Sequence, residues 1–189
     1  MFAFKKKYFL IVENIKDINL SKIKPNRKFF IIYRNRIKNI KLEELQKFRR
    51  KCKTKGFKFI VANDIKLNNL LNTDGIYLSS FNNSLKSLSY KSQNKIIIGS
   101  AHNLNEISQK KKQGCNYIFF SKLFRVDYTP KSIFMGILKF NNIFFKFKNV
   151  IPLGGIKFNN LNKMKNVQAD GFAIMSEIKK KPAISNRLF

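Results

Sequence analysis

A three-part unit recurs along this chain: an apolar run, a polar stretch with helical spacing, and a second apolar run. It reads FKFIVANDIKLNNLLNTDGIYLSS, then NKIIIGSAHNLNEISQKKKQGCNYIFFSK, then KNVIPLGGIKFNNLNKMKNVQADGFAIMSE. The apolar runs are short and mostly lack alternating polar residues, which is typical of strands buried on both faces of a parallel sheet. The repeat therefore predicts an α/β fold in which strands alternate with helices.

Eight apolar runs of this kind can be counted along the 189 residues. They are Tyr8–Val12, Phe29–Tyr33, Phe57–Val61, Gly75–Leu78, Lys95–Gly99, Tyr117–Phe120, Val150–Leu153 and Gly171–Met175. Eight strands alternating with helices predict a (β/α)8 TIM barrel, here a single compact domain over residues 1–189. The stretch after Val12 is too short for a full outer helix, so we expect a reduced first helix, whereas Leu42–Lys55 is the clearest helix. A doubly wound open sheet is the alternative.

Two local patterns refine this expectation. In the second unit, Leu104 and Ile107 predict the apolar edge of a helix, and Lys110–Lys112 its solvated edge. Asp74-Gly75 and Asp170-Gly171 are expected to form turns between a helix and the next strand, because both residue types tolerate unusual backbone angles.

The formal net charge of +29 raises the question of a nucleic-acid partner, since lysine-rich surfaces release counterions from phosphates. The lysines, however, are scattered along the whole chain, and no helix-turn-helix, zinc-finger or aromatic RNA-recognition signature accompanies them. A bias in overall composition explains the charge more simply, so a nucleic-acid partner is not expected.

No apolar run approaches the roughly 18 residues that a membrane helix needs. The N-terminal sequence imitates a signal peptide, but its apolar stretch is short and ends at Glu13. Cys52 and Cys115 lack the spacing of metal ligands and are interpreted as reduced thiols. These features predict a cytoplasmic protein without a membrane partner. The oligomeric state is left open.

In a barrel of this type, functional residues lie just beyond the carboxyl ends of the strands. The residues at those positions are Glu13, Asn14, Arg34, Arg36, Asn63, Asp64, Ser79, Ser80, Ser100, His102, Ser121, Lys122, Gly154, Gly155 and Ser176. Hydroxyl, small and basic side chains dominate this set, which suits an anionic ligand. Late barrel loops often hold phosphate with backbone N–H groups, so Gly154 and Gly155 are expected to approach a phosphate. The alternative is a tight turn that serves no ligand.

In order along the chain, the motifs IYRNR, FIVAND, TDGIYL, GSAH, GCNY, VDYTPK, LGGI and ADGFAIMS lie at these strand ends or next to them. Over about residues 8–178, their order and spacing resemble the family of thiamine phosphate synthases and TenI thiazole tautomerases. That family has a (β/α)8 barrel. Its synthases join hydroxymethylpyrimidine diphosphate to thiazole phosphate in thiamine biosynthesis and expel pyrophosphate with the help of Mg²⁺. The resemblance implies the same transferase activity, phosphorylated substrates and Mg²⁺ cofactor here.

The resemblance also implies roles for individual residues. The substrate-binding set is Arg34, Arg36, Asn63, Ser100, Thr129, Gly154, Gly155, Met175 and Ser176; Lys122 and Lys131 are candidate catalytic residues, and Asp64 and Asn82 are candidate metal ligands. Asn82 stands where the family has an aspartate, and an ungapped alignment places Ala62-Asn63 on the family's Asn-Asp pair, although a one-residue slip restores Asn63-Asp64. Carboxylates are better Mg²⁺ ligands than amides, so these departures weaken the expected metal site.

The departures leave two alternatives open. One is an isomerase resembling the thiazole tautomerases, in which Lys122 stands in place of the usual histidine; the other is a noncatalytic protein that binds a phosphorylated ligand. His102, the only histidine, is interpreted as an orienting or packing residue. If Gly155 contacts a phosphate through its backbone, Gly155→Ala is expected to weaken ligand binding more than it lowers stability.

Overall fold

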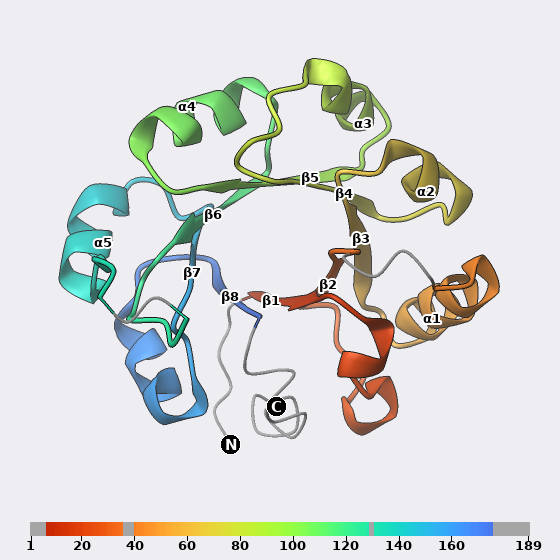
Figure 1. Ribbon diagram of the computed structural model, residues 1–189, viewed down its shortest axis with the longest axis horizontal. Helices are drawn as coiled ribbons and strands as arrows, with labels where there is room; N and C mark the ends of the chain where they lie inside the picture. The colour runs from red at the N-terminus through yellow and green to blue at the C-terminus, as the bar shows by residue number, and fades with distance from the viewer. Residues whose placement is uncertain (1–6, 36–39, 129–130, 176–189) are drawn as a thin grey trace.

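The computed structural model describes residues 7–35, 40–128 and 131–175. Arg36, Thr129 and Ser176 lie outside these residues. Each strand pairs in parallel with the next along the chain, and the eighth pairs with the first, so the sheet closes into a barrel (Figure 1). The strands are β1 (Lys7–Val12), β2 (Phe29–Tyr33), β3 (Lys58–Ala62), β4 (Gly75–Leu78), β5 (Ile96–Ala101), β6 (Tyr117–Ser121), β7 (Val150–Leu153) and β8 (Gly171–Ile174). The predicted barrel is thus confirmed, and the open-sheet alternative is wrong.

The connections between strands vary in length and regularity. The helices are the α-helices α1 (Leu42–Thr54), α2 (Ile65–Leu70), α3 (Leu88–Ser92), α4 (Leu104–Lys112) and α5 (Ile137–Phe144), and the 3₁₀ helices η1 (Ile15–Asp17), η2 (Leu20–Lys22), η3 (Leu85–Ser87) and η4 (Phe158–Asn166). The reduced first helix is confirmed, because η1 and η2 occupy that place. None of the helices among the described residues combines the length and apolar character that a membrane span requires.

Both faces of the barrel strands are buried, which explains the unalternated apolar runs. On β1, Phe9 and Ile11 point into the barrel interior, whereas Tyr8, Leu10 and Val12 belong to the outer core beneath the helices. Strands that bury both faces need apolar residues at every position. The barrel is therefore a packed core rather than a channel.

Aromatic rings fill much of the barrel interior. The ring centroids of Phe9 and Phe30 lie 4.7 Å apart, and those of Phe9 and Phe119 lie 5.1 Å apart. Tyr77 extends this cluster, with its ring centroid 5.7 Å from that of Phe119. Such contacts lie within the 4.5–7 Å range in which aromatic pairs attract each other.

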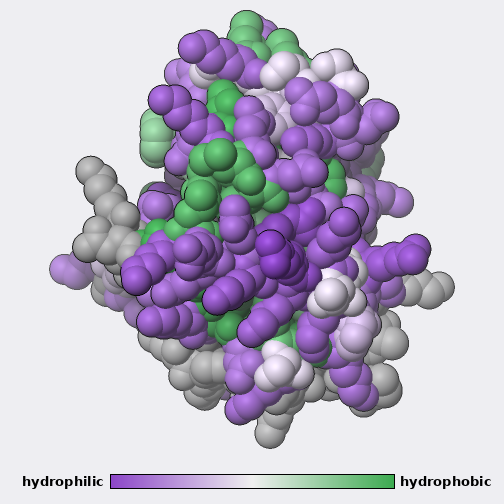
Figure 2. All heavy atoms as spheres, turned by 90° about the vertical axis from the view of Figure 1, so that its right-hand side faces the viewer, coloured by the Kyte–Doolittle hydropathy of each residue, from purple (hydrophilic) through white to green (hydrophobic). Residues whose placement is uncertain are grey.

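Basic residues are distributed over several helices. The last turns of α1, α4 and η4 carry, respectively, Lys51 and Lys53, Lys110–Lys112, and Lys163 and Lys165. Cations there interact favourably with the negative end of an α-helix dipole. Hydrophilic side chains also spread over much of the face in Figure 2, around an apolar area. This distribution agrees with a compositional origin of the charge; the absence of a nucleic-acid partner stays a prediction.

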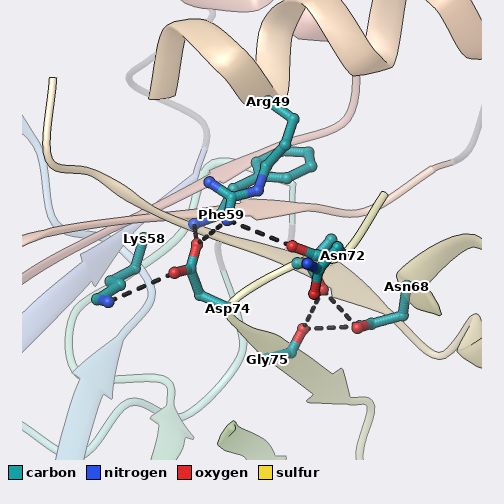
Figure 3. A network of polar contacts seen from close by, with 8 residues as sticks. Arg49, Lys58, Phe59, Asn68, Asn72, Asp74 and Gly75 are labelled. Atoms are coloured by element: carbon teal, nitrogen blue, oxygen red, sulfur yellow. Dashed lines mark hydrogen bonds and ion pairs between the residues drawn. The ribbon is translucent and has the colours of Figure 1, made fainter. Parts of the chain in front are cut away.

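Asp74 joins three elements at the amino-terminal end of the barrel (Figure 3). Its carboxylate lies 3.1 Å from the Arg49 guanidinium of α1 and 3.4 Å from the Lys58 ammonium of β3, and it accepts a hydrogen bond of 2.9 Å from the Phe59 N–H. Asn68 of α2 donates to the Gly75 carbonyl over 2.6 Å. The Asp-Gly pair therefore fixes the start of β4 through the side chain of its aspartate.

Gly75 and Gly171 are needed for a reason other than unusual backbone angles. Neither has a positive φ angle. A Cβ at Gly75 would collide with the Ile96 carbonyl of β5, and one at Gly171 with the Lys7 carbonyl of β1. Both glycines begin a strand where the neighbouring backbone passes very close to them. The turn interpretation of these pairs is corrected accordingly: close approach of strands, rather than backbone freedom, selects glycine.

Gly75→Ala should destabilise the barrel by about 1–3 kcal/mol or more, because backbone atoms must move to admit the Cβ. Gly56→Ala is the control: its φ is +74°, but its nearest neighbour would be 3.5 Å from the Cβ, so its cost is mainly backbone strain of about 1–2 kcal/mol. Urea unfolding of both variants measures the difference. Equal stability of Gly75→Ala and wild type would contradict this explanation.

Candidate functional site

A cavity of about 460 Å³ opens at the carboxyl ends of the strands. Its lining residues are Glu13, Arg34, Tyr77, Ser79, Ser80, Phe81, Ser100, His102, Ser121, Val126, Tyr128, Leu153, Gly154, Gly155, Ile156, Ala173, Ile174 and Met175. Of the strands, β3 contributes none of these residues, directly or through the loop that follows it. The volume is typical of sites for small ligands, and the position is the one at which TIM barrels bind them.

The structure brings only part of the predicted site together. Arg34, Ser100, Gly154, Gly155 and Met175 all line the cavity. The other described candidates, which do not line it, are Asn63, Asp64, Asn82, Lys122 and Lys131. The binding residues predicted from β2, β5, β7 and β8 therefore share one cavity, whereas the predicted metal ligands and catalytic lysines lie outside its lining.

Tyr77 links the aromatic interior to the floor of the cavity. Burial raises the pKa of its phenol above the ordinary value of 10.0. A hydrogen bond with Ser100 and the nearby charge of Arg34 act against this increase. The phenol is therefore neutral at physiological pH. The Arg34 guanidinium makes no hydrogen bond or ion pair with any other residue in the described ranges. Arg34 thus offers a positive charge to a ligand in the cavity.

Gly154 and Gly155 both have backbone angles that favour glycine, with φ of 94° and 67°. Their carbonyls are used within the protein: Phe124 N–H donates to Gly154 over 3.1 Å, and the Asn160 amide donates to Gly155 over 2.8 Å. Their N–H groups donate to no acceptor among the described residues. This arrangement suits the binding of an anion by backbone N–H groups.

Asn63 and Asn82 are hydrogen-bonded to each other beside the cavity. The Asn63 Oδ1 accepts bonds from the Asn82 Nδ2, over 3.1 Å, and from the Ser79 N–H, over 3.0 Å. The Asn63 Nδ2 donates to the Ser79 Oγ over 2.6 Å. These amides support the loop after β4 and hold Ser79 at the cavity wall.

Asp64 does not join these amides in a metal site. It is exposed, and its carboxylate caps the N-terminus of α2 by accepting a hydrogen bond of 2.8 Å from the Leu67 N–H. No cluster of three or more histidine, cysteine, aspartate or glutamate side chains that could hold a metal occurs in the described part of the chain. Mg²⁺ prefers octahedral coordination by oxygen, commonly from carboxylates. Asp64 is therefore the one carboxylate among the predicted ligands, and with one oxygen engaged in the helix cap it offers Mg²⁺ a poor set of protein ligands.

Lys122 lies just behind the cavity wall. Its ammonium donates to the Ser132 Oγ over 2.9 Å and lies 5.6 Å from the ring centroid of Tyr128, which lines the cavity. Lys131 is exposed.

Lys110, which the sequence predicts to be solvated, supports the cavity from the far side of the loop after β4. It is fully buried, and its ammonium donates to the Ser79 carbonyl over 2.8 Å, the Asn82 carbonyl over 2.7 Å and the Gln113 Oε1 over 3.0 Å. Desolvation lowers the pKa of Lys110, against opposing effects of Cys115 and Glu106.

The predicted faces of α4 are therefore wrong in part. Leu104, expected on the apolar edge, is 60% exposed, and Lys110, expected on the solvated edge, is buried. Ile107 is buried as expected, and Lys110 follows it by three residues, which places both on the same helix face. That spacing is the signal in the sequence that could have identified the buried lysine.

Sequence reasoning also missed the aromatic residues around the cavity. Phe81 and Tyr128 are both 76% exposed and line it from the loops after β4 and β6. Exposed aromatic side chains in loops have no periodicity that marks them as ligand contacts. Only the position of Phe81 three residues beyond a strand could have drawn attention to it.

The surroundings of Gly155 revise the expected effect of Gly155→Ala. A Cβ there would lie 2.5 Å from the Arg125 carbonyl oxygen and 2.6 Å from the Phe124 carbonyl oxygen, so the new methyl group would displace backbone. We now expect a loss of stability of about 1–3 kcal/mol from overpacking alone. Thermal melts measure it, with Gly154→Ala as the milder comparison because its nearest contact would be 3.2 Å from Lys122 Cα. An unchanged melting temperature in Gly155→Ala would overturn this expectation.

Comparison with known proteins agrees with this architecture. The chain is 28% identical over 131 residues to the thiamine-phosphate synthase of Prochlorococcus marinus, covering 67% of this chain and 37% of that protein. It is 26% identical over 140 residues to the thiamine-phosphate synthase of Geobacillus thermodenitrificans, covering 72% of this chain and 63% of that protein. The chain thus matches less than two thirds of either relative.

Among solved structures, the thiamine phosphate pyrophosphorylase of Pyrococcus furiosus superimposes with a TM-score of 0.72 at 21% identity, over 97% of this chain and 95% of that one. The 2-keto-3-deoxy-6-phosphogluconate aldolase of Zymomonas mobilis gives 0.62 at 12% identity, over 96% and 91%. These two likenesses concern the fold. The family comparison goes further, because residues 24–178 match the TMP-TENI family, described as thiamine monophosphate synthase. This chain is a member of that family.

Proposed function

We propose that this protein is a transferase that joins hydroxymethylpyrimidine diphosphate to thiazole phosphate, the reaction that its family resemblance implies. The observation that carries the proposal is the single cavity shared by Arg34, Ser100, Gly154, Gly155 and Met175. These residues come from four separate strands or the loops that follow them. Membership of the family and the names of the relatives support the same activity.

In this reaction, the C–O bond between the pyrimidine methylene carbon and the diphosphate breaks, and that carbon forms a bond to the thiazole nitrogen. Negative charge develops on the departing pyrophosphate. Groups that stabilise this charge more strongly in the transition state than in the bound substrate accelerate the reaction. Arg34 is placed to do so, while the N–H groups of Gly154 and Gly155 would hold the thiazole phosphate.

The metal requirement is where this protein departs from the expectation. The carboxylate of Asp64 caps α2, and the amides of Asn63 and Asn82 are engaged with each other. We therefore assign no catalytic step to Mg²⁺ here. The pyrophosphate charge would instead be stabilised by the cations of the chain.

Purified protein incubated with both phosphorylated precursors should produce thiamine phosphate, detected by chromatography, with Mg²⁺ and with EDTA as separate arms. No product at high protein concentration in either arm would overturn the proposal.

Arg34→Ala should lower kcat/KM by about 10- to 100-fold, which corresponds to the loss of one charged hydrogen bond of about 1.5–3 kcal/mol. Arg50→Ala, which removes an exposed guanidinium from α1, is the matched control and should leave turnover unchanged.

A second candidate is an isomerase of the thiazole tautomerase type. The observation that favours it is the poor fit of the described residues to a metal site, since this reaction needs no Mg²⁺. Lys122, which stands in place of the histidine of the tautomerase branch, would act as the base. Its ammonium lies beside Tyr128 at the cavity wall, and proton transfer would require it to leave Ser132.

Conversion between thiazole tautomers can be followed by NMR. If this candidate is correct, Lys122→Ala should lower the conversion rate by about 100-fold or more, in the range of 10²–10⁴ for a general base. Lys139→Ala, which removes an exposed lysine from α5, serves as the control. Conversion at the wild-type rate in Lys122→Ala would remove Lys122 from the mechanism.

A further inference from the structure

His102 and Ser121 form a hydrogen-bonded pair at the cavity that neither proposed reaction yet uses. The Ser121 Oγ lies 2.8 Å from the His102 Nδ1, and both residues line the cavity. Ser121 ends β6, and His102 follows β5 directly. The register of these strands pairs Ala101 with Phe120, so the two residues are brought together by the sheet itself.

The backbone of His102 is also fixed. Its N–H donates to the Glu106 Oε2 over 2.8 Å, and the Glu106 Oε1 accepts a bond of 2.7 Å from the Asn103 amide. The Glu106 carboxylate thus fixes the main chain of His102 at the start of α4, and Ser121 fixes its ring. A side chain held at both ends is preorganised for contact with a ligand.

The hydrogen bond between Ser121 and the His102 Nδ1 leaves the second ring nitrogen, Nε2, available to a ligand. The Nε2 of His102 makes no hydrogen bond with another described residue. When the Ser121 hydroxyl donates to Nδ1, the neutral ring must carry its proton on Nε2; when the ring is charged, both nitrogens carry protons. In both of these forms Nε2 is a hydrogen-bond donor, which suits an anionic oxygen. In the remaining neutral form Nδ1–H donates to the Ser121 Oγ and Nε2 accepts, so a bound anion would select the forms that carry a proton on Nε2.

We propose that His102 is a ligand-contacting residue whose Nε2 donates to a phosphate oxygen of the bound substrate, and that Ser121 is its positioning residue. The proposal rests on the proposed function, because it takes its ligand from the phosphorylated substrates named there. Strands β5, β6 and β7 are neighbours spaced by about 4.8 Å, so His102 and Gly154 lie roughly 10 Å apart along the rim. A single small ligand can span that distance. This role differs from the interpretation of His102 as an orienting or packing residue, which stays the alternative to this proposal.

Because the chain has one histidine, imidazole NMR signals report on His102 without assignment. Thiazole phosphate is titrated into ¹⁵N-labelled full-length protein at constant pH, and its binding is measured in parallel by calorimetry. We expect the Nε2 signal to shift and to saturate at the calorimetric Kd, whereas the unphosphorylated thiazole alcohol should not shift it. Calorimetric binding without a shift would overturn the role of His102 and leave the proposed function standing. No binding at all would overturn both.

The positioning role of Ser121 is tested separately. Ser121→Ala should change the relative ¹⁵N shifts of the two imidazole nitrogens in the ligand-free protein and weaken thiazole phosphate binding about 3- to 10-fold. Ser121→Thr, which keeps the hydroxyl, should restore both, and thermal melts identify any loss of folding. Ser89→Ala is the matched control, since its hydroxyl bonds only to the Lys86 carbonyl on a distant helix. Wild-type shifts and affinity in Ser121→Ala would show that Ser121 does not position the ring.

Discussion

The closed barrel depends on filling a narrow interior with aromatic side chains. Eight strands of four to six residues enclose a space in which Phe9, Phe30, Tyr77 and Phe119 pack together. The rings occupy the centre of the barrel, and the cavity of about 460 Å³ lies beyond them at the carboxyl ends of the strands. Tyr77 belongs to both regions, so the packing that stabilises the fold also determines the depth of the site.

Much of this architecture follows from local sequence. A strand buried on both faces must be apolar at every position, and that requirement makes the eight runs visible without an alignment. Counting them predicts the barrel, and the rule that sites lie at carboxyl ends then selects Arg34, Ser100, Gly154 and Gly155. Of the thirteen described residues picked from the strand ends, nine line the cavity; they are Glu13, Arg34, Ser79, Ser80, Ser100, His102, Ser121, Gly154 and Gly155. The barrel and the position of these residues at its cavity follow from the periodicity of the chain and the direction of parallel strands; their roles stay predictions.

The remainder depends on contacts between distant segments. The sequence predicts that Lys110 is one of three solvated lysines, yet its ammonium donates hydrogen bonds to two carbonyls in a loop about thirty residues earlier in the chain. The sequence predicts that Gly155 approaches a ligand, yet a Cβ at this position would collide with the backbone of residues 124 and 125. The resemblance implies that Asp64 is a metal ligand, yet its carboxylate accepts a hydrogen bond from the Leu67 N–H at the start of α2. In each case the residue type is compatible with several partners, and only the fold decides among them.

The scarcity of acidic residues links composition to chemistry. The chain has 39 basic residues and only 10 acidic ones, and several of the latter are committed to structural contacts. These are Asp17, Asp64 and Glu106 in helix N-terminal caps, Asp74 in ion pairs with Arg49 and Lys58, and Asp127 in an ion pair with Lys157. Among the described cavity residues, Glu13 is the single carboxylate. A cavity with this lining offers an anionic ligand a guanidinium, an imidazole and backbone N–H groups, which belong to Arg34, His102 and the Gly154-Gly155 turn.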